Sequence, residues 1–89
     1  MYDILEDMVY INIPYVPENK NLDVDLVQKE LQAVDISEEA KWTAFEAIYN
    51  LHPRGVSFTE QDLKEAFQLE KALSRLGVPY RVSEESEFA

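Results

Sequence analysis

The chain has 89 residues, of which 18 are acidic and eight are basic, and its formal net charge is −10. This charge argues against direct binding to nucleic acid or to an anionic membrane, because both would repel it. The sequence contains no cysteine, so disulfides, thiolate catalysis and cysteine metal sites are excluded. The length fits one domain with a single modest core.

The beginning of the sequence predicts neither a secretory signal nor a membrane anchor. It has no positively charged start, and its longest apolar stretch, residues 8–16, is interrupted by Asn12 and Pro14 and is too short to span a bilayer. The absence of cysteine is typical of a reducing compartment. We therefore expect a cytoplasmic protein.

Residues 9–16 are the best strand candidate. They are rich in β-branched and aromatic side chains, and the odd-numbered residues share one face. Pro14 cannot donate a hydrogen bond to a sheet, so this strand is expected either to lie at an edge or to end there. Residues 2–5 are a candidate for a third strand.

A first helix is predicted after a polar loop. Asp23 is a suitable N-cap, and Leu22 and Val27 occupy the positions of a hydrophobic staple. Apolar residues recur from there at helical spacing as far as Val34. A second helix start follows, with Asp35 and Ser37 as competing N-caps.

The second helix is expected over residues 37–51. It carries so much apolar surface that we expect it to be covered on two sides, with Trp42 and Phe45 as its anchors. Pro53 disfavours helix at the residue before it and ends the segment.

The third helix has the clearest predicted limits. Thr59 is its expected N-cap, Gly77 has the position of a left-handed C-terminal residue, and Val78 can fold back on Leu73 as in a Schellman motif. Residues 78–82 then alternate as a short strand. Residues 83–89 are expected to form a flexible acidic tail, which leaves residues 1–82 as the domain.

These elements predict a small α+β domain. Two strands from the chain ends, with a third as an option, would pair and pack against three helices. The alternative is a purely helical bundle with frayed ends.

Motifs for catalysis and for metal or cofactor binding are weak. His52 is the only histidine, and no glycine-rich phosphate loop is present. Oxygen-bearing side chains from Asn19 to Glu30 follow the spacing of a calcium loop, but Val24 occupies the position that requires glycine. We therefore expect no enzyme activity, no metal and no cofactor.

The most specific surface prediction concerns the acidic residues near the two chain ends. If the terminal strands pair, these residues come together at one negative edge next to exposed aromatic side chains. The predicted partner-binding residues are Asp3, Glu6, Asp7, Tyr10, Glu84, Glu85, Glu87 and Phe88. The competing interpretation is that this charge only keeps the protein soluble.

The function expected from these observations is a non-enzymatic, acidic protein-interaction module whose partner is a protein with a basic surface. In composition the chain resembles small phage-encoded anti-defence proteins, and this resemblance implies an inhibitor that occupies a nucleic-acid-binding surface. The alternative is a structural or assembly module, for example a homodimer. It would associate through an edge strand at residues 9–16 or through the leucine face of the third helix.

Overall fold

The structure, a computed structural model, describes residues 8–49 and 53–85. Its sheet contains β1 (Met8–Ile13), β2 (Arg54–Thr59) and β3 (Arg81–Ser83) in the order β2-β1-β3. β1 is antiparallel to both neighbours, with Ile11 opposite Val56 on one side and opposite Val82 on the other. The first strand of the chain is therefore the central strand of the sheet.

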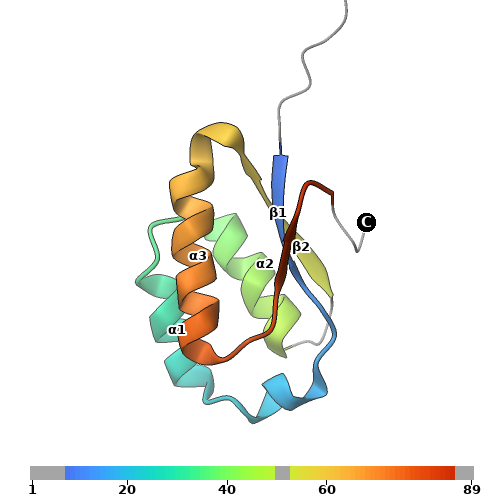
Figure 1. Ribbon diagram of the computed structural model, residues 1–89. Helices are drawn as coiled ribbons and strands as arrows, with labels where there is room; N and C mark the ends of the chain where they lie inside the picture. The colour runs from blue at the N-terminus through green and yellow to red at the C-terminus, as the bar shows by residue number, and fades with distance from the viewer. Residues whose placement is uncertain (1–7, 50–52, 86–89) are drawn as a thin grey trace, which may run out of the picture.

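Three α-helices lie on one side of this sheet (Figure 1). They are α1 (Val24–Gln32), α2 (Glu38–Tyr49) and α3 (Leu63–Leu76), and short 3-10 turns η1 (Pro17–Asn21) and η2 (Glu60–Asp62) precede α1 and α3. α2 and α3 pack against the sheet, and α1 packs against both of these helices. The predicted α+β class, with strands packed against three helices, is confirmed.

The core forms where the helices meet the sheet. Ile11 and Ile13 of β1 are fully buried, and Val56 and Phe58 of β2 lie beside them on the same face. The helices contribute buried aliphatic side chains, and α2 contributes alanines, which allow it to approach the sheet closely. The main helical core residues are Val27, Leu31, Ala40, Ala44, Ala47, Ile48, Leu69, Ala72 and Leu73.

Most local capping signals form as the sequence predicts, but the Thr59 cap of the third helix does not: α3 begins at Leu63 after η2, and the Thr59 hydroxyl donates to the Asp62 carboxylate at 3.0 Å without capping a backbone N–H. The Asp23 carboxylate accepts a hydrogen bond from the Asp25 backbone N–H at 2.9 Å, so it caps α1. Ser37, one of the two candidates for the next cap, accepts from the Ala40 N–H at 3.1 Å. Gly77 has φ +76°, and the Val78 N–H donates to the Leu73 carbonyl, as a Schellman motif requires.

The predicted order of elements was wrong at one strand. No strand was predicted between the second and third helices, but residues 54–59 form β2, which pairs along the full length of β1. β1 is therefore not an edge strand. It ends at Ile13, and Pro14 lies just beyond it, where a missing N–H removes no bond from the sheet. Residues 2–5 lie outside the described residues.

Two surface assignments also change. Trp42, predicted to be an anchor of the second helix, is 60% exposed, and Phe67, which belongs to the apolar residues of the third helix and was expected on its buried side, is 57% exposed. The leucine face of α3 lies in the core, because Leu69 and Leu73 are fully buried. It therefore presents no apolar surface to a second molecule.

The face of the sheet opposite the helices contains one fully buried polar residue, Asn12. Its Nδ2 donates to the Ser83 Oγ at 2.8 Å and to the Glu85 carbonyl at 3.3 Å. The chain after β3 is thus held against the middle of the sheet. Residues 83–85, which were assigned to the tail, take part in the fold, and residues 86–89 lie outside the described part.

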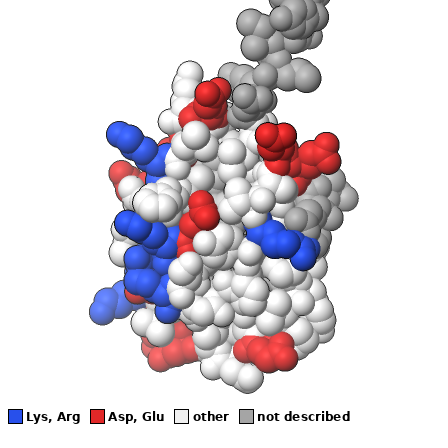
Figure 2. All heavy atoms as spheres, in the orientation of Figure 1, with Lys and Arg blue, Asp and Glu red and all other residues white. Residues whose placement is uncertain are grey.

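Basic side chains are unevenly distributed over the surface. Figure 2 shows most of those in view gathered along the side where α1 and α3 lie. Lys64, Lys71 and Arg75 belong to α3, where the Lys71 Nζ lies 4.8 Å from the centre of the Phe67 ring and Arg75 pairs with Glu30 at 2.8 Å. The exposed ring of Phe67 therefore has a basic environment.

Candidate functional site

The structure describes only part of the surface predicted at the chain ends. Tyr10 lies on the open face of the sheet, half-buried, next to Ser83 of β3, and the exposed Glu84 and Glu85 follow directly. Tyr10 is thus opposite the residue that precedes Glu84 in the chain, and the Glu85 carbonyl accepts from Asn12 rather than from Tyr10. The other predicted residues, Asp3, Glu6, Asp7, Glu87 and Phe88, lie outside the described residues.

A better-defined site is the cleft between α1 and α2. Its volume is about 350 Å³, and it is open to solvent along one side. The buried Leu31 of α1 and the half-buried Phe45 of α2 supply apolar lining, and the exposed indole of Trp42 forms a wall. The remaining lining residues are Gln28, Gln32, Glu38 and Lys41.

Trp42 is held by a row of aromatic rings along α2. The Trp42 ring is stacked on Phe45 with centroids 6.0 Å apart, and Phe45 contacts Tyr49 at 5.1 Å. The spacing of three and four residues places all three rings on one side of the helix. Phe45 and Tyr49 pack on the core, and the Tyr49 hydroxyl donates to the Leu22 carbonyl at 2.6 Å. The exposed indole therefore rests on a fixed base.

Carboxylates surround Trp42 along its own helix. Glu38, Glu39 and Glu46 occupy positions i−4, i−3 and i+4 relative to it, which are its neighbours on the helix surface. Glu38 has 80% of its side chain exposed, whereas Lys41, to which it is paired at 3.2 Å, is only 13% exposed. The negative group of this pair thus faces solvent and the positive group faces inward.

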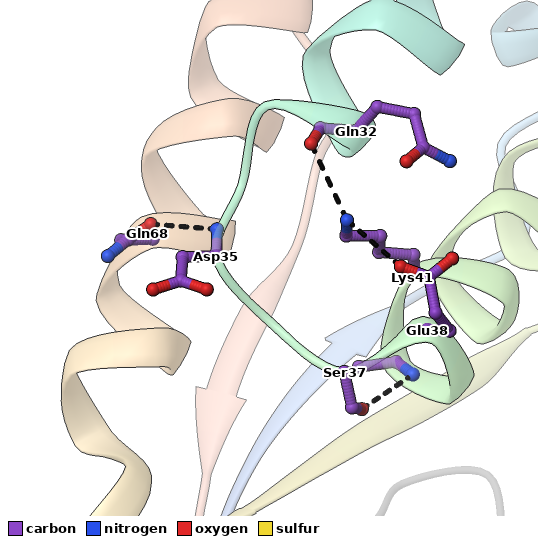
Figure 3. Close-up of polar contacts among 7 residues, drawn as sticks. Gln32, Asp35, Ser37, Glu38, Lys41 and Gln68 are labelled. Atoms are coloured by element: carbon purple, nitrogen blue, oxygen red, sulfur yellow. Dashed lines mark hydrogen bonds and ion pairs between the residues drawn. The ribbon is translucent and has the colours of Figure 1, made fainter.

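Lys41 joins the two helices at the end of the cleft (Figure 3). Its ammonium group also donates to the Gln32 carbonyl in the last turn of α1, at 3.5 Å. A cation at a helix C-terminus interacts favourably with the unpaired carbonyls there. In the loop between α1 and α2, the Asp35 N–H donates to the Gln68 Oε1 of α3 at 3.0 Å. These bonds fix the width of the cleft at this end.

The far end of the aromatic row, beyond the cleft, is also close to negative charge. Burial raises the pKa of Tyr49, and the charges of Asp23 and Asp25 at the start of α1 raise it further. Both carboxylates therefore act on the last turn of α2. Acidic groups lie at each end of the aromatic row, with Lys41 already paired between them.

The chemistry of the cleft is that of a binding site. Its walls offer apolar area, two glutamine amides and one exposed carboxylate, a combination suited to holding a side chain of another molecule. Across residues 8–49 and 53–85, no three histidine or acidic side chains are placed to hold a metal ion. Within the same residues, no helix is long and apolar enough to cross a membrane.

Sequence reasoning missed this site because it assigned Trp42 to the core. The signal that could have revealed it is the flanking charge. A tryptophan with glutamates at i−4, i−3 and i+4 shares its helix face with groups that require water, so that face is expected to be exposed.

Comparison with known proteins adds no assignment. A scan against protein-family models, a search of curated proteins and a search of solved structures each returned no match. The function must therefore be argued from the surface itself.

Proposed function

We propose that this protein is a non-enzymatic interaction module that binds a basic surface of a partner protein through the cleft at Trp42. The observation that carries the proposal is the 60% exposed indole, stacked on Phe45 and flanked by glutamates. A large exposed aromatic ring on a rigid base is the kind of residue that dominates protein interfaces. The negative groups around it select the charge of the partner.

Binding would proceed in two stages. The net charge of −10 attracts a basic surface at long range and raises the rate of encounter. An arginine or lysine of the partner then lies over the Trp42 ring, where a cation–π contact contributes about 0.5–2 kcal/mol. Glu38, whose side chain is 80% exposed, can pair with a neighbouring basic group, whereas Glu46 is already paired with Arg54 at 3.4 Å; the apolar cleft accepts an adjoining side chain.

The partner's basic surface is proposed to be one that otherwise binds nucleic acid. A folded domain with 18 acidic residues among 89 can present carboxylates to groups that normally contact phosphates. The protein would then inhibit by occupation, which is also what its compositional resemblance to phage-encoded anti-defence proteins implies.

The test compares two variants that each lose one exposed aromatic ring. Trp42→Ala removes the ring from the cleft, and Phe67→Ala removes a ring of similar exposure, 57%, from the basic side of α3. Each immobilised variant would capture proteins from a lysate of the source, with washes at about 0.1 M and about 1 M salt. The Debye length falls from about 10 Å to about 3 Å between these concentrations.

We expect a nucleic-acid-binding protein to be retained by the wild type and by Phe67→Ala at low salt and released at high salt. With the purified partner, Trp42→Ala should weaken the Kd at least about 30-fold, which corresponds to the roughly 2 kcal/mol of an interface hot spot. Unchanged affinity in Trp42→Ala would contradict the proposed site. Retention at high salt would contradict the charge-based mechanism.

A further inference from the structure

The second surface of interest is the outer edge of β2. In the described part of the chain, β2 pairs with β1 on one side only, and no strand follows on the other. The six residues Arg54–Thr59 therefore present a regular edge whose outward backbone groups can pair with another strand.

This edge lacks the usual protection. Exposed edges are normally blocked by lysine, proline, a bulge or short length. β2 carries a charge only at its first residue, Arg54, and has no proline within it. Both edge strands begin with an arginine and follow a proline, but the opposite edge, β3, has only three residues, whereas β2 has six. Of the two edges, β2 is the one suited to strand addition.

We propose that β2 pairs with β2 of a second copy of this chain, antiparallel and about a two-fold axis at Ser57, which gives one continuous six-stranded sheet. A pair of this kind is closed and stops at two copies. The proposal does not depend on the binding role assigned to the Trp42 cleft.

The sequence of β2 is complementary to itself in this register. Val56 of one copy lies opposite Phe58 of the other on the face that meets the helices, where apolar cross-strand pairs stabilise a sheet. Arg54, which pairs with Glu46 of its own copy at 3.4 Å, lies opposite Glu60, which directly follows the strand, so opposite charges also meet at both ends of the paired strands. The backbone of Thr59 is extended, at φ −80° and ψ 168°, and carries the strand direction as far as Glu60.

Space for the second strand exists beside the edge. A groove of about 340 Å³ runs between β2 and the first half of α2. The side of α2 that borders it carries the small side chains Ser37, Ala40 and Thr43, and the long side chains in the lining are those of Glu39 and Arg54. Glu39 is the one carboxylate in the lining.

Charge gives this dimer a recognisable salt dependence. Two copies, each with a net charge of −10, repel one another, and the axis brings the two Glu39 side chains to the same side of the sheet. Salt screens this repulsion and leaves the backbone and apolar contacts in place. Self-association should therefore strengthen with salt, whereas binding of a basic partner at the cleft should weaken.

The register can be tested by cross-linking, because the chain contains no cysteine of its own. Directly opposite residues of paired strands have Cβ atoms about 4.5–5.5 Å apart, close to the span of a disulfide. Ser57→Cys should therefore give a disulfide-linked dimer on mild oxidation. Thr59→Cys, on the same face of the same strand, is the matched control, because its two copies would lie about 13 Å apart.

Sedimentation of the protein without introduced cysteines provides the second measurement. The wild type should form dimers and nothing larger, with an association constant that rises between about 0.1 M and about 1 M salt. Ser57→Lys opposes two like charges at the axis and should lower that constant about tenfold or more. Ser74→Lys makes the same change in net charge at an exposed position of α3, and it should leave the association constant near the wild-type value.

Four outcomes would overturn the proposal. In sedimentation, they are a wild type that remains monomeric at about 1 mM in both salts, or assemblies larger than two copies. In cross-linking, the outcome is an equal yield of dimer from Ser57→Cys and Thr59→Cys. For the two lysine variants, it is an equal effect on the association constant. A monomeric wild type would leave β2 available to an extended peptide of another protein. Circular dichroism of each variant would establish that it is folded.

Discussion

Asn12 offers the sharpest test of how the sheet is held together. Its side chain is completely buried on the face away from the helices, and its Nδ2 donates to the Ser83 Oγ and the Glu85 carbonyl. Two substitutions separate the loss of these bonds from the effect of charge. Asn12→Ala removes the donor, and Asn12→Asp replaces the donor with a carboxylate of nearly the same shape.

The magnitude for Asn12→Ala follows from the two bonds. A hydrogen bond contributes about 0.5–1.5 kcal/mol net, and an acceptor left without a partner costs more only where water cannot reach it. Ser83 is half-buried and Glu85 is exposed, so both acceptors can turn to water. We expect the free energy of unfolding to fall by about 2 kcal/mol, which lowers Tm by roughly 10 °C in a domain of this size.

Asn12→Asp should cost more at neutral pH and less in acid. A buried carboxylate facing two oxygen acceptors is both desolvated and repelled, at a cost of roughly 3–5 kcal/mol. These effects raise the pKa of the introduced carboxyl above the value in the unfolded chain. Between those two pKa values the folded state binds more protons, so the variant gains stability relative to the wild type as pH falls.

The assay is urea unfolding followed by circular dichroism, with the wild type and both variants measured from pH 7.5 to about pH 5. The deficit of Asn12→Asp relative to the wild type should shrink across this range, and that of Asn12→Ala should stay constant. A constant deficit for Asn12→Asp would show that the side chain at position 12 reaches water. An Asn12→Ala variant as stable as the wild type would refute the reasoning entirely.

Three further predictions concern local features. Gly77→Ala should lower the free energy of unfolding by only about 1 kcal/mol in urea titrations. The φ of +76° strains an alanine, but no atom lies within 4 Å of the added Cβ. A loss of several kcal/mol would mean that the site is crowded. Asp23→Ala should lower it by about 1 kcal/mol through loss of the α1 cap, and Asp23→Asn should recover most of this; equal losses would rule out the cap. The raised pKa of Tyr49 means that the folded state holds the phenol proton more tightly, so stability falls as pH rises above about 10. Tyr49→Phe should reduce that alkaline loss in unfolding titrations, and an identical pH profile would contradict the assignment.

The features predicted correctly from sequence depend on neighbours within a few residues. Asp23 caps α1 and Gly77 ends α3 because the bonds involved span five residues or fewer. Such contacts form wherever these residue types stand at the right spacing, whatever the rest of the chain does. This is why the helix limits and the α+β class could be predicted.

β2 could not be predicted in the same way. Pro53, Arg54 and Gly55 are typical of a turn, and glycine is poorly suited to a strand by its local preference. The segment becomes a strand because Val56 and Phe58 face the core beside β1, which lies more than 40 residues earlier in the sequence. That pairing is a tertiary effect, and without it the prediction left open an edge position for β1, which the structure rules out in favour of the alternative that the strand ends before Pro14.

The candidate site shows a similar limit. The net charge and the expectation of an aromatic contact surrounded by acids came from composition alone. Which aromatic residue stays exposed depends on how α1 and α2 pack, and Trp42 was assigned to the core for that reason. The acidic surface predicted at the chain ends stays a prediction, because most of its residues lie outside the described part of the chain and the register places Tyr10 opposite Ser83.

The central position of β1 has a consequence for how the protein is made. Both neighbours of β1 come from later in the chain, and the bond from Asn12 to Ser83 joins residues 71 positions apart. During synthesis, α1 and α2 can form while Ile11 and Ile13 still lack the strands that flank them. Contacts of such long sequence separation slow folding relative to a helical bundle of equal length. The nascent chain therefore carries an unpaired apolar strand until β2 is made, about 40 residues after β1, and this is the stage at which a chaperone would find it.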